Sequence, residues 1–249
     1  MTKLIVLLLL ANPLFSISGK DLALKINQRM SPTDSKADLS MILTNKKGKT
    51  RSSIIKSISK DQGKKQIMWF LYPPDDKGIA FLKLEHIDKE TEMRLWLPAF
   101  KKIRRISSNR KSDNFMGSDL SYEDLSNRNI NDYDYSILNM ELYDDNMCYV
   151  LISKPKIELN SQYSQHISWI DTNLYVPIYE KSFDKNDFLI KEKFYNYKEI
   201  NNYFILTKLL VKNNLKNHST LLEFKNISLN TGFEDNFFQE KFLKRMPPK

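Results

Sequence analysis

The stretch that decides the fold is residues 69–125, WFLYPPDDKGIAFLKLEHIDKETEMRLWLPAFKKIRRISSNRKSDNFMGSDLSYEDL. Its first apolar run ends at Pro73-Pro74, and the turn residues DDKG at 75–78 lead into a second apolar run, Ile79–Leu84. A Gly-containing polar turn between two apolar runs is typical of a β-hairpin. The stretch therefore begins with two paired strands.

A third strand follows the polar turn at residues 88–91. Met93, Leu95 and Leu97 are apolar at alternate positions, and Pro98 ends the strand because proline has no amide donor. Residues 101–111, KKIRRISSNRK, then hold six Lys or Arg and no acid. The segment SYEDL, from Ser121, has the residue types of a helix N-terminus and predicts a short helical turn.

Five patterns in this chain, in this order, resemble the LolA-like outer-membrane lipoprotein-sorting proteins, in the branch found beside lipid-exporting transporters. They are the Pro-ended aromatic strand 69–74, DKGIAFL at 76–82, WLPA at 96–99, KIRRI at 102–106 and FMGSDLSYED at 115–124. The resemblance continues more weakly in YSQHISWID at 163–171 and FFQEKFLKR at 237–245. The resemblance covers roughly residues 21–245. It implies a curled antiparallel sheet that forms a half-open barrel, with helices over the concave face.

Residues 1–18 have the organisation of a secretory signal peptide, because Lys3 precedes the apolar run Leu4–Ala11, and Ser16 and Ser18 are small residues suited to cleavage. A membrane anchor is the alternative, but a spanning helix needs about 20 apolar residues. We expect cleavage near Ser18, one LolA-like domain over residues 19–249, and export of a soluble, unlipidated chain to the periplasm.

The rest of the chain predicts one amphipathic helix and a meandering sheet. Leu22, Ile26 and Met30 share one face of the helix predicted at 21–30, and residues 37–60 form a hairpin around the turn at 45–49. Six further strands are predicted at 147–153, 163–170, 176–182, 188–197, 203–212 and 220–229. About eleven strands are too many for one flat layer, so the sheet must curl. The fold class is mainly β, in the α+β sense.

Charge and reactive residues favour a binding protein over an enzyme. The net charge is +9, or +8 after the one charge of Lys3 is subtracted, but the basic residues are dispersed, so we expect no nucleic acid partner. The three His are far apart, the single Cys148 lies in a predicted strand where we expect it to be buried, and no metal, phosphate-loop or hydrolase motif occurs. Paired carboxylates of a glycoside hydrolase are the residual enzymatic alternative. We expect no cofactor and no metal.

Large apolar side chains in the strands are the candidates for a ligand pocket. In runs such as IMWFLY both faces of the strand are apolar, so both faces must be covered. For any single aromatic residue, core packing explains this as well as a pocket does. For the pocket wall we propose Trp69, Phe70, Phe81, Leu82, Leu95, Trp96, Trp169 and Phe194.

The basic run has two interpretations that the sequence leaves open. Lys101, Lys102, Arg104, Arg105 and Arg110 could contact anionic headgroups or an acidic partner. The same charges would also protect an edge strand from pairing with another sheet.

The family resemblance implies a monomeric periplasmic carrier. Its cargo would be the acyl chains of a lipoprotein or a free lipid, its donor an inner-membrane lipid-exporting transporter, and its acceptor at the outer membrane. The alternative is an accessory domain that docks on the transporter without carrying lipid. An outer-membrane β-barrel is a further rival, disfavoured by the ending RMPPK and by the Lys and Glu on many strand positions, which we expect to face outward.

Overall fold

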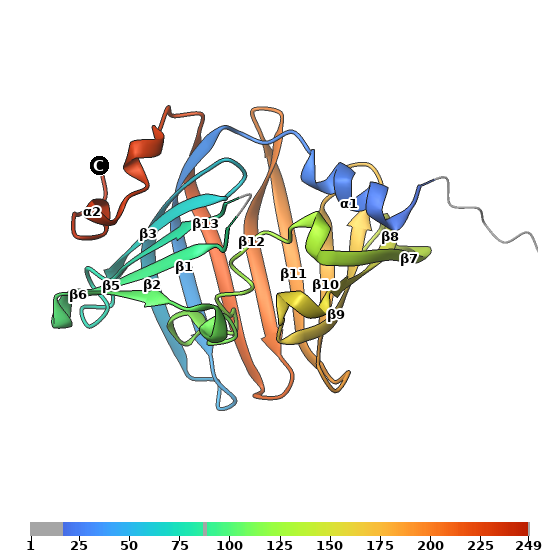
Figure 1. Ribbon diagram of the computed structural model, residues 1–249, viewed down its shortest axis with the longest axis horizontal. Helices are drawn as coiled ribbons and strands as arrows, with labels where there is room; N and C mark the ends of the chain where they lie inside the picture. Colours follow the sequence, from blue (N-terminus) through green and yellow to red (C-terminus); the bar gives the residue numbers. More distant parts are fainter. Residues whose placement is uncertain (1–16, 87–88, 249) are drawn as a thin grey trace, which may run out of the picture.

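The computed structural model describes residues 17–86 and 89–248, and its main feature is one antiparallel sheet of 13 strands in the order β6-β5-β4-β3-β2-β1-β13-β12-β11-β10-β9-β8-β7. The strands are β1 (Asp34–Thr44), β2 (Thr50–Lys60), β3 (Lys65–Tyr72), β4 (Ala80–Leu84), β5 (Glu92–Leu97), β6 (Lys102–Ile106), β7 (Tyr133–Tyr143), β8 (Asn146–Pro155), β9 (Tyr163–Asp171), β10 (Pro177–Asp184), β11 (Leu189–Ile200), β12 (Tyr203–Asn213) and β13 (His218–Leu229). The sheet curls without closing, so β6 and β7 are its two edges (Figure 1).

The sequence-based fold prediction is confirmed in class and corrected in detail. The sheet has 13 strands where we expected about eleven, and the two beyond that count are β6, in the basic run, and β7, which was not predicted. Its alternation is broken by a β-bulge between Ile137 and Asn139, which moves the later side chains to the opposite face. The predicted hairpins, the end of β5 at Pro98 and the burial of Cys148 are all confirmed.

Helix α1 (Gly19–Asn27) covers the concave side of the sheet at the β7 edge. Leu22 is fully buried and packs with Leu151 and Ile170, and Ile17 adds to the same cluster. Ser18 caps the helix by accepting a hydrogen bond from the amide of Asp21 at 3.1 Å. The predicted signal peptide, residues 1–18, otherwise lies outside the described residues. In residues 17–86 and 89–248, no helix is long and apolar enough to cross a membrane.

Apolar side chains on β1 to β5, β12 and β13 form the main core on the concave side. Met41, Ile55 and Phe81 are at most 2% exposed there. In β3 and β4 the neighbouring residues point the other way and form a second core on the convex side. This confirms that the apolar runs of these strands are covered on both faces.

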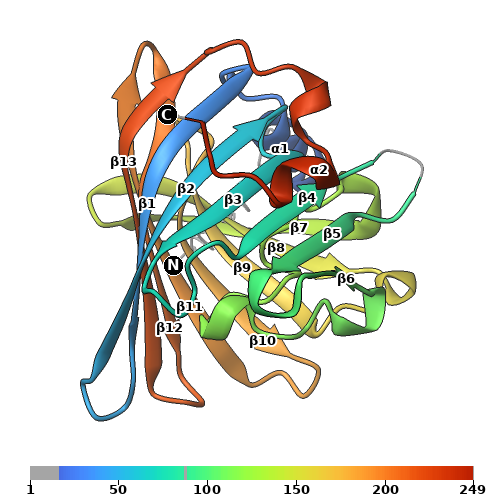
Figure 2. The ribbon, with the colours of Figure 1, turned by 90° about the vertical axis from the view of Figure 1, so that its left-hand side faces the viewer.

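The convex core is covered by the C-terminal segment, residues 233–245, which contains α2 (Glu240–Leu243) and runs back across β3 to β5 (Figure 2). Phe238 and Leu243 are almost fully buried against Trp69 and Leu82. The indole of Trp69 donates a hydrogen bond to the carbonyl oxygen of Phe242 at 3.3 Å. The C-terminal segment therefore covers only the convex face of these strands, and a different segment must cover their concave face.

Candidate ligand-binding cleft

The concave face is crossed by an irregular stretch between β6 and β7, residues 107–132, which we call the lid segment. It contains short 3-10 turns at Ser108–Arg110, Phe115–Gly117 and Ile130–Asp132, and it contains no α-helix. The prediction at SYEDL is confirmed in its N-cap bond, because the amide of Asp124 donates to the hydroxyl of Ser121 at 3.2 Å, but residues 122–125 form hydrogen-bonded turns and no helix. Ser121 donates two hydrogen bonds to the carboxylate of Asp124, one from its backbone amide and one from its hydroxyl, both at 2.8 Å. The same carboxylate also accepts hydrogen bonds from side chains of the sheet.

The first half of the lid segment closes the apolar part of the concave face. The ring of Phe115 lies 5.1 Å from that of Phe81 and 6.1 Å from that of Phe70, and Tyr122 packs against both Phe115 and Phe81. Leu120 is buried in the same cluster. These aromatic contacts in edge-to-face or tilted geometry anchor the segment to β3 and β4.

The second half of the lid segment meets charged residues of the sheet. Asp124 is nearly inaccessible and accepts hydrogen bonds from Lys191 and Lys193 of β11, each at 2.7 Å, and from the hydroxyl of Tyr163 of β9 at 2.8 Å. Burial alone would raise the pKa of Asp124, but the two ammonium groups outweigh it and hold the pKa well below its usual value. Asp124 is therefore ionised.

Four residues further on, Arg128 forms a bidentate pair with Glu180 of β10, with distances of 2.7 and 2.8 Å. Glu180 also accepts from Ser168 at 2.8 Å and from Lys193 at 3.2 Å. Burial opposes ionisation of Glu180, but Arg128 and Lys193 together hold its pKa well below the ordinary value. The fork geometry fixes the position of Arg128 as well as its charge.

His166 of β9 lies beside this pair and is 2% exposed. Its Nδ1 is 2.9 Å from the hydroxyl of Ser182. Burial, assisted by the positive charge of Arg128, lowers the pKa of His166 well below its usual value. His166 is therefore neutral at physiological pH and is a hydrogen-bonding group of the wall.

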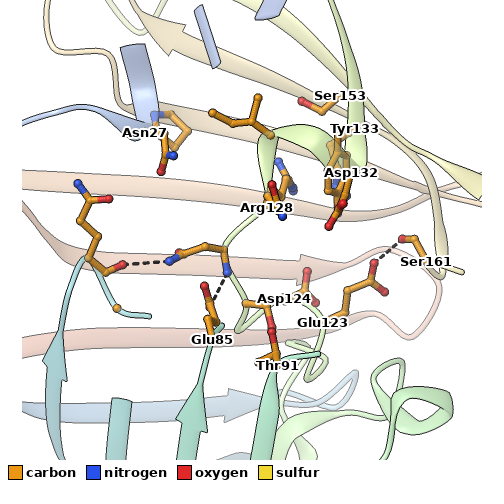
Figure 3. A pocket seen from close by; sticks show the side chains of 18 of the residues that line it. Asn27, Glu85, Thr91, Glu123, Asp124, Arg128, Asp132, Tyr133, Ser153 and Ser161 are labelled. Atoms are coloured by element: carbon orange, nitrogen blue, oxygen red, sulfur yellow. Dashed lines mark hydrogen bonds between the residues drawn. The ribbon is translucent and has the colours of Figure 1, made fainter. Parts of the chain in front are cut away.

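Further hydrogen bonds fasten the lid segment to both halves of the sheet (Figure 3). The backbone amide of Asn127 donates to the carboxylate of Glu85 at 2.8 Å, and its side-chain amide donates to the backbone carbonyl of Gln62 at 3.1 Å. At the other end, the carboxylate of Asp119 accepts from Thr220 at 2.7 Å. Together with the bonds of Asp124 and Arg128 to β9, β10 and β11, these contacts join the two ends of the curled sheet.

Two adjoining cavities lie under and beside the lid segment. The larger is a cleft of about 1680 Å³, lined mainly by polar side chains of α1, β7 to β11 and the lid segment. The smaller is an apolar pocket of about 230 Å³ beneath the lid segment. Its apolar lining is Leu39, Met41, Ile55, Met68, Phe115, Leu120, Leu125, Leu209, Leu222 and Phe224. The two share the lining residues Gly63, Asp124, Asn127 and Phe224, so they adjoin.

The structure divides the eight residues proposed for the pocket wall among three clusters. Phe70, Phe81 and Leu95 belong to the concave core, directly behind Phe115 of the lid segment. Trp69, Leu82 and Trp96 lie on the convex face under the C-terminal segment. Trp169 and Phe194 lie on the convex face of β9 and β11, where they pack around Tyr179. Only the first group adjoins the apolar pocket.

The basic residues singled out in the sequence lie at the β6 edge of the sheet. Lys102, Arg104 and Arg105 are exposed on β6, which has one strand neighbour, β5. Lys101 precedes them with a positive φ of 48°. Arg110, in the lid segment, pairs with Asp113. This placement is compatible with edge protection and with contact to a partner.

The charged residues of the cleft were absent from the sequence-based site. We expected Lys and Glu at many strand positions to face outward, and many do, but Glu180, Lys191 and Lys193 are exceptions that face the concave interior. A signal existed in KEKF at 191–194, where Phe194 and Lys193 alternate and one of them must point inward. Among the described residues, no group of three or more His, Cys, Asp or Glu could hold a metal ion.

Comparison with known proteins places this architecture in a family. A family model described only as an uncharacterized protein matches residues 62–245. No curated protein sequence matches the chain. A solved domain from Vibrio parahaemolyticus, designated an outer-membrane lipoprotein-sorting protein, is 31% identical, with a TM-score of 0.86 over 91% of this chain and 98% of its own.

Two other solved structures share the fold. A DUF1329 family protein from Desulfovibrio piger is 29% identical, with a TM-score of 0.85 over 90% of this chain and 97% of its own. A LolA superfamily protein from Nitrosomonas europaea has a TM-score of 0.73 over 91% of this chain and 100% of its own, at 17% identity. By its sequence and its open 13-stranded sheet, the chain belongs to the LolA-like family of outer-membrane lipoprotein-sorting proteins.

Proposed function

We propose that the protein is a periplasmic carrier that holds an acyl chain in the apolar pocket beneath the lid segment and delivers the cargo toward the outer membrane. The observation that carries this proposal is the pocket itself, about 230 Å³ and lined by ten apolar side chains. Each methylene group that enters such a lining gains about 0.8 kcal/mol. A carrier of this kind needs no reactive group.

The size of the pocket supports a role for movement of the lid segment. Sites for drug-sized ligands usually measure roughly 300–1,000 Å³, and this pocket is smaller. If Phe115 moves outward with the lid segment, Phe70, Phe81 and Leu95 become part of the wall, which enlarges the pocket toward β3 to β5. We therefore propose these three, of the eight candidates, as the wall of the loaded state.

Filling the pocket tests the proposal directly. Leu125 lies in the lid segment and lines the pocket, so Leu125→Trp should occupy the space of the ligand and weaken binding of a fluorescent fatty-acid analogue to the delipidated protein at least tenfold. Leu138→Trp is the matched control, because Leu138 is 60% exposed on β7. Equal affinity of the two variants would place the fatty acid elsewhere.

A wild-type protein that binds no acyl probe would overturn the carrier function. It would favour the alternative, an accessory domain that docks on a lipid-exporting transporter. Lipid extraction from the purified protein followed by mass spectrometry gives an independent answer, since a carrier should retain part of its cargo.

Export is a separate part of the proposal. The predicted cleavage after Ser18 would remove the N-cap of α1 and leave a charged amino group at its first residue, which is unfavourable beside the helix dipole. Intact-mass measurement on protein from the periplasmic fraction determines the first residue of the mature chain. A chain that retains Met1 in this fraction would contradict cleavage near Ser18, and absence of the protein from the fraction would contradict export.

A further inference from the structure

The concave face of β7 to β11 differs in chemistry from that of β1 to β5. Cross-strand pairing places Tyr135 opposite Ser153, Ser153 opposite His166, and His166 opposite Ser182. The row is completed by Lys191 opposite Ser182. One continuous row of five polar side chains therefore crosses this half of the sheet, where the other half presents Leu, Ile, Met and Phe.

Several hydroxyl groups on this wall have no hydrogen-bond partner within the described part of the chain. They belong to Tyr133, Tyr135, Ser153 and Tyr195, all of which line the larger cleft. Tyr133 is 7% exposed and Ser153 is 2% exposed. None of these four oxygens is among the solvent-shielded unpaired atoms, so they face the open space of the cleft. There a hydroxyl can donate to and accept from a polar ligand.

The lid segment contributes one more unpaired group to the same cleft. The hydroxyl oxygen of Ser126 is shielded from solvent and has no partner in the residues described. Leaving such a group unsatisfied costs about 1–3 kcal/mol. Arg128, Tyr133 and Ser153 can be followed on the wall of the cleft in Figure 3.

The charged groups buried beside this wall, by contrast, are already paired with one another. Arg128 is matched by Glu180, and Asp124 by Lys191 and Lys193. An ionic head group would have to compete with these buried pairs, and breaking one leaves an uncompensated charge. The groups that the wall itself presents to the cleft are neutral hydroxyls, each of which can both donate and accept.

We propose that this wall, formed by Tyr133, Tyr135, Ser153, Tyr195 and Ser126, binds the neutral, hydroxyl-rich head group of an amphiphile, such as one or more sugar rings. The proposal rests on the proposed carrier function, because the chain of the same amphiphile enters the apolar pocket. Four residues shared by the two cavities make this continuous binding possible.

A peptide head group fits the wall less well. Extended peptides bind proteins most often by adding a strand to a free sheet edge, through main-chain hydrogen bonds. Strands β8 to β11 are paired on both sides and offer side chains only, whereas β7 has one free edge, so an acyl peptide is included in the test. Hydroxyls that donate and accept match the hydroxyls of a sugar, which have the same double capacity.

The test compares head groups on one alkyl chain. Dodecyl maltoside, dodecanoate, dodecyl phosphate and an N-dodecanoyl pentapeptide each displace a fluorescent fatty-acid analogue from the delipidated full chain, below their critical micelle concentrations. The maltoside should bind at least tenfold more tightly than the other three. The double variant Tyr133→Phe, Tyr195→Phe removes only two hydroxyl oxygens and should weaken maltoside binding about tenfold, as expected for two hydrogen bonds, with dodecanoate unchanged.

Tyr72→Phe is the matched control, because Tyr72 is 50% exposed on β3 and outside both cavities. If dodecanoate and maltoside bind equally, and the double variant affects neither, the head-group site is refuted while the carrier function stands. Tightest binding of the acyl peptide or of the phosphate would refute the neutral sugar-like head group. If no probe binds, the carrier function itself fails.

Discussion

Asp124 is the residue that joins the lid segment to the sheet. Its carboxylate takes hydrogen bonds from two lysines and a tyrosine, on strands 39 to 69 residues away in the chain. Both lysines are also almost fully buried. Removing one partner of a buried pair is costly because the remaining charge stays in a site of low polarity.

Replacement of Asp124 by Asn should therefore lower the free energy of unfolding by about 3–5 kcal/mol. Asp113→Asn is a matched control in the same segment, since Asp113 and its partner Arg110 are both more than 40% exposed. For that exposed pair the expected loss is below about 1 kcal/mol. Urea denaturation measures both, and equal losses would show that Asp124 does not hold the lid segment to the sheet.

His166 gives the protein a specific pH dependence. The groups around it are Arg128, Glu180, Lys193 and Asp124. Burial and Arg128 keep its pKa in the folded state well below the usual value, whereas in the unfolded chain it titrates near 6.5. The unfolded state therefore binds more protons below about pH 6.5, so the stabilising contribution is complete above that pH and is lost as the pH falls.

The free energy of unfolding should decrease below about pH 6.5 by up to about 1.4 kcal/mol per pH unit because of this one residue. His166→Gln should remove that part of the slope. Ser182→Ala is the control, because it removes the hydrogen-bond partner and keeps the imidazole, so it should lower stability at every pH and retain the slope. Identical slopes in wild type and His166→Gln would disprove the assignment.

Single residues also show the limit of pattern reading. Alternation along KEKF fixes which residues of β11 share a face, but it does not tell which face is inside. Lys193 points inward because Asp124 and Glu180 compensate its charge, and Phe194 points outward because it packs against Tyr179, with ring centroids 4.9 Å apart. Neither partner is near in sequence, so the charged wall could not be predicted.

At the scale of elements, strands with regular alternation were predictable and the covering segments were not. In the hairpin β1–β2, the alternation of Leu39, Met41 and Leu43 with polar residues indicates which residues face the core, and this determines the pairing register. The lid segment has no periodic pattern, and its conformation depends on contacts with β3, β4, β9, β10, β11 and β13. Tertiary contacts of this kind override local preference, which is why the segment at SYEDL forms turns.

The role of the basic residues on the edge strand β6 can be tested by substitution. Changing Lys102, Arg104 and Arg105 to Gln should leave the free energy of unfolding within about 0.5 kcal/mol, because all three are exposed. If these residues contact headgroups, binding to vesicles that contain anionic lipid should weaken. The effect should be greatest at 0.01 M salt, where the Debye length is about 30 Å.

The control removes the same amount of charge elsewhere. Lys46, Lys47 and Lys49 are exposed at the turn between β1 and β2, and their replacement by Gln lowers the net charge equally. If both triple variants bind vesicles equally, vesicle binding depends on the net charge of the protein and not on the basic residues of β6. If the β6 variant keeps its vesicle binding but aggregates, the basic residues protect the edge of the sheet.

For the whole molecule, the curl of the sheet creates two unlike walls within one concave surface. The apolar wall comes from β1 to β5, β12 and β13, and the polar wall from β7 to β11. The class of fold and its open curl could be predicted from strand number and family resemblance. The division of the concave face could not, because it depends on which face of each strand turns inward.

Ligand binding should be visible in hydrogen exchange of the lid segment. Its amides form few backbone hydrogen bonds, such as that of Tyr122 to Asp113 at 3.1 Å, so they should exchange faster than those of the central strands. An acyl chain in the pocket would pack against Phe115, Leu120 and Leu125 and should slow exchange across residues 107–132 several-fold. The turn at residues 45–49 lies outside both cavities and should be unchanged. Slower exchange at that turn, with the lid segment unaffected in a ligand-saturated sample, would show that the acyl chain binds outside the pocket.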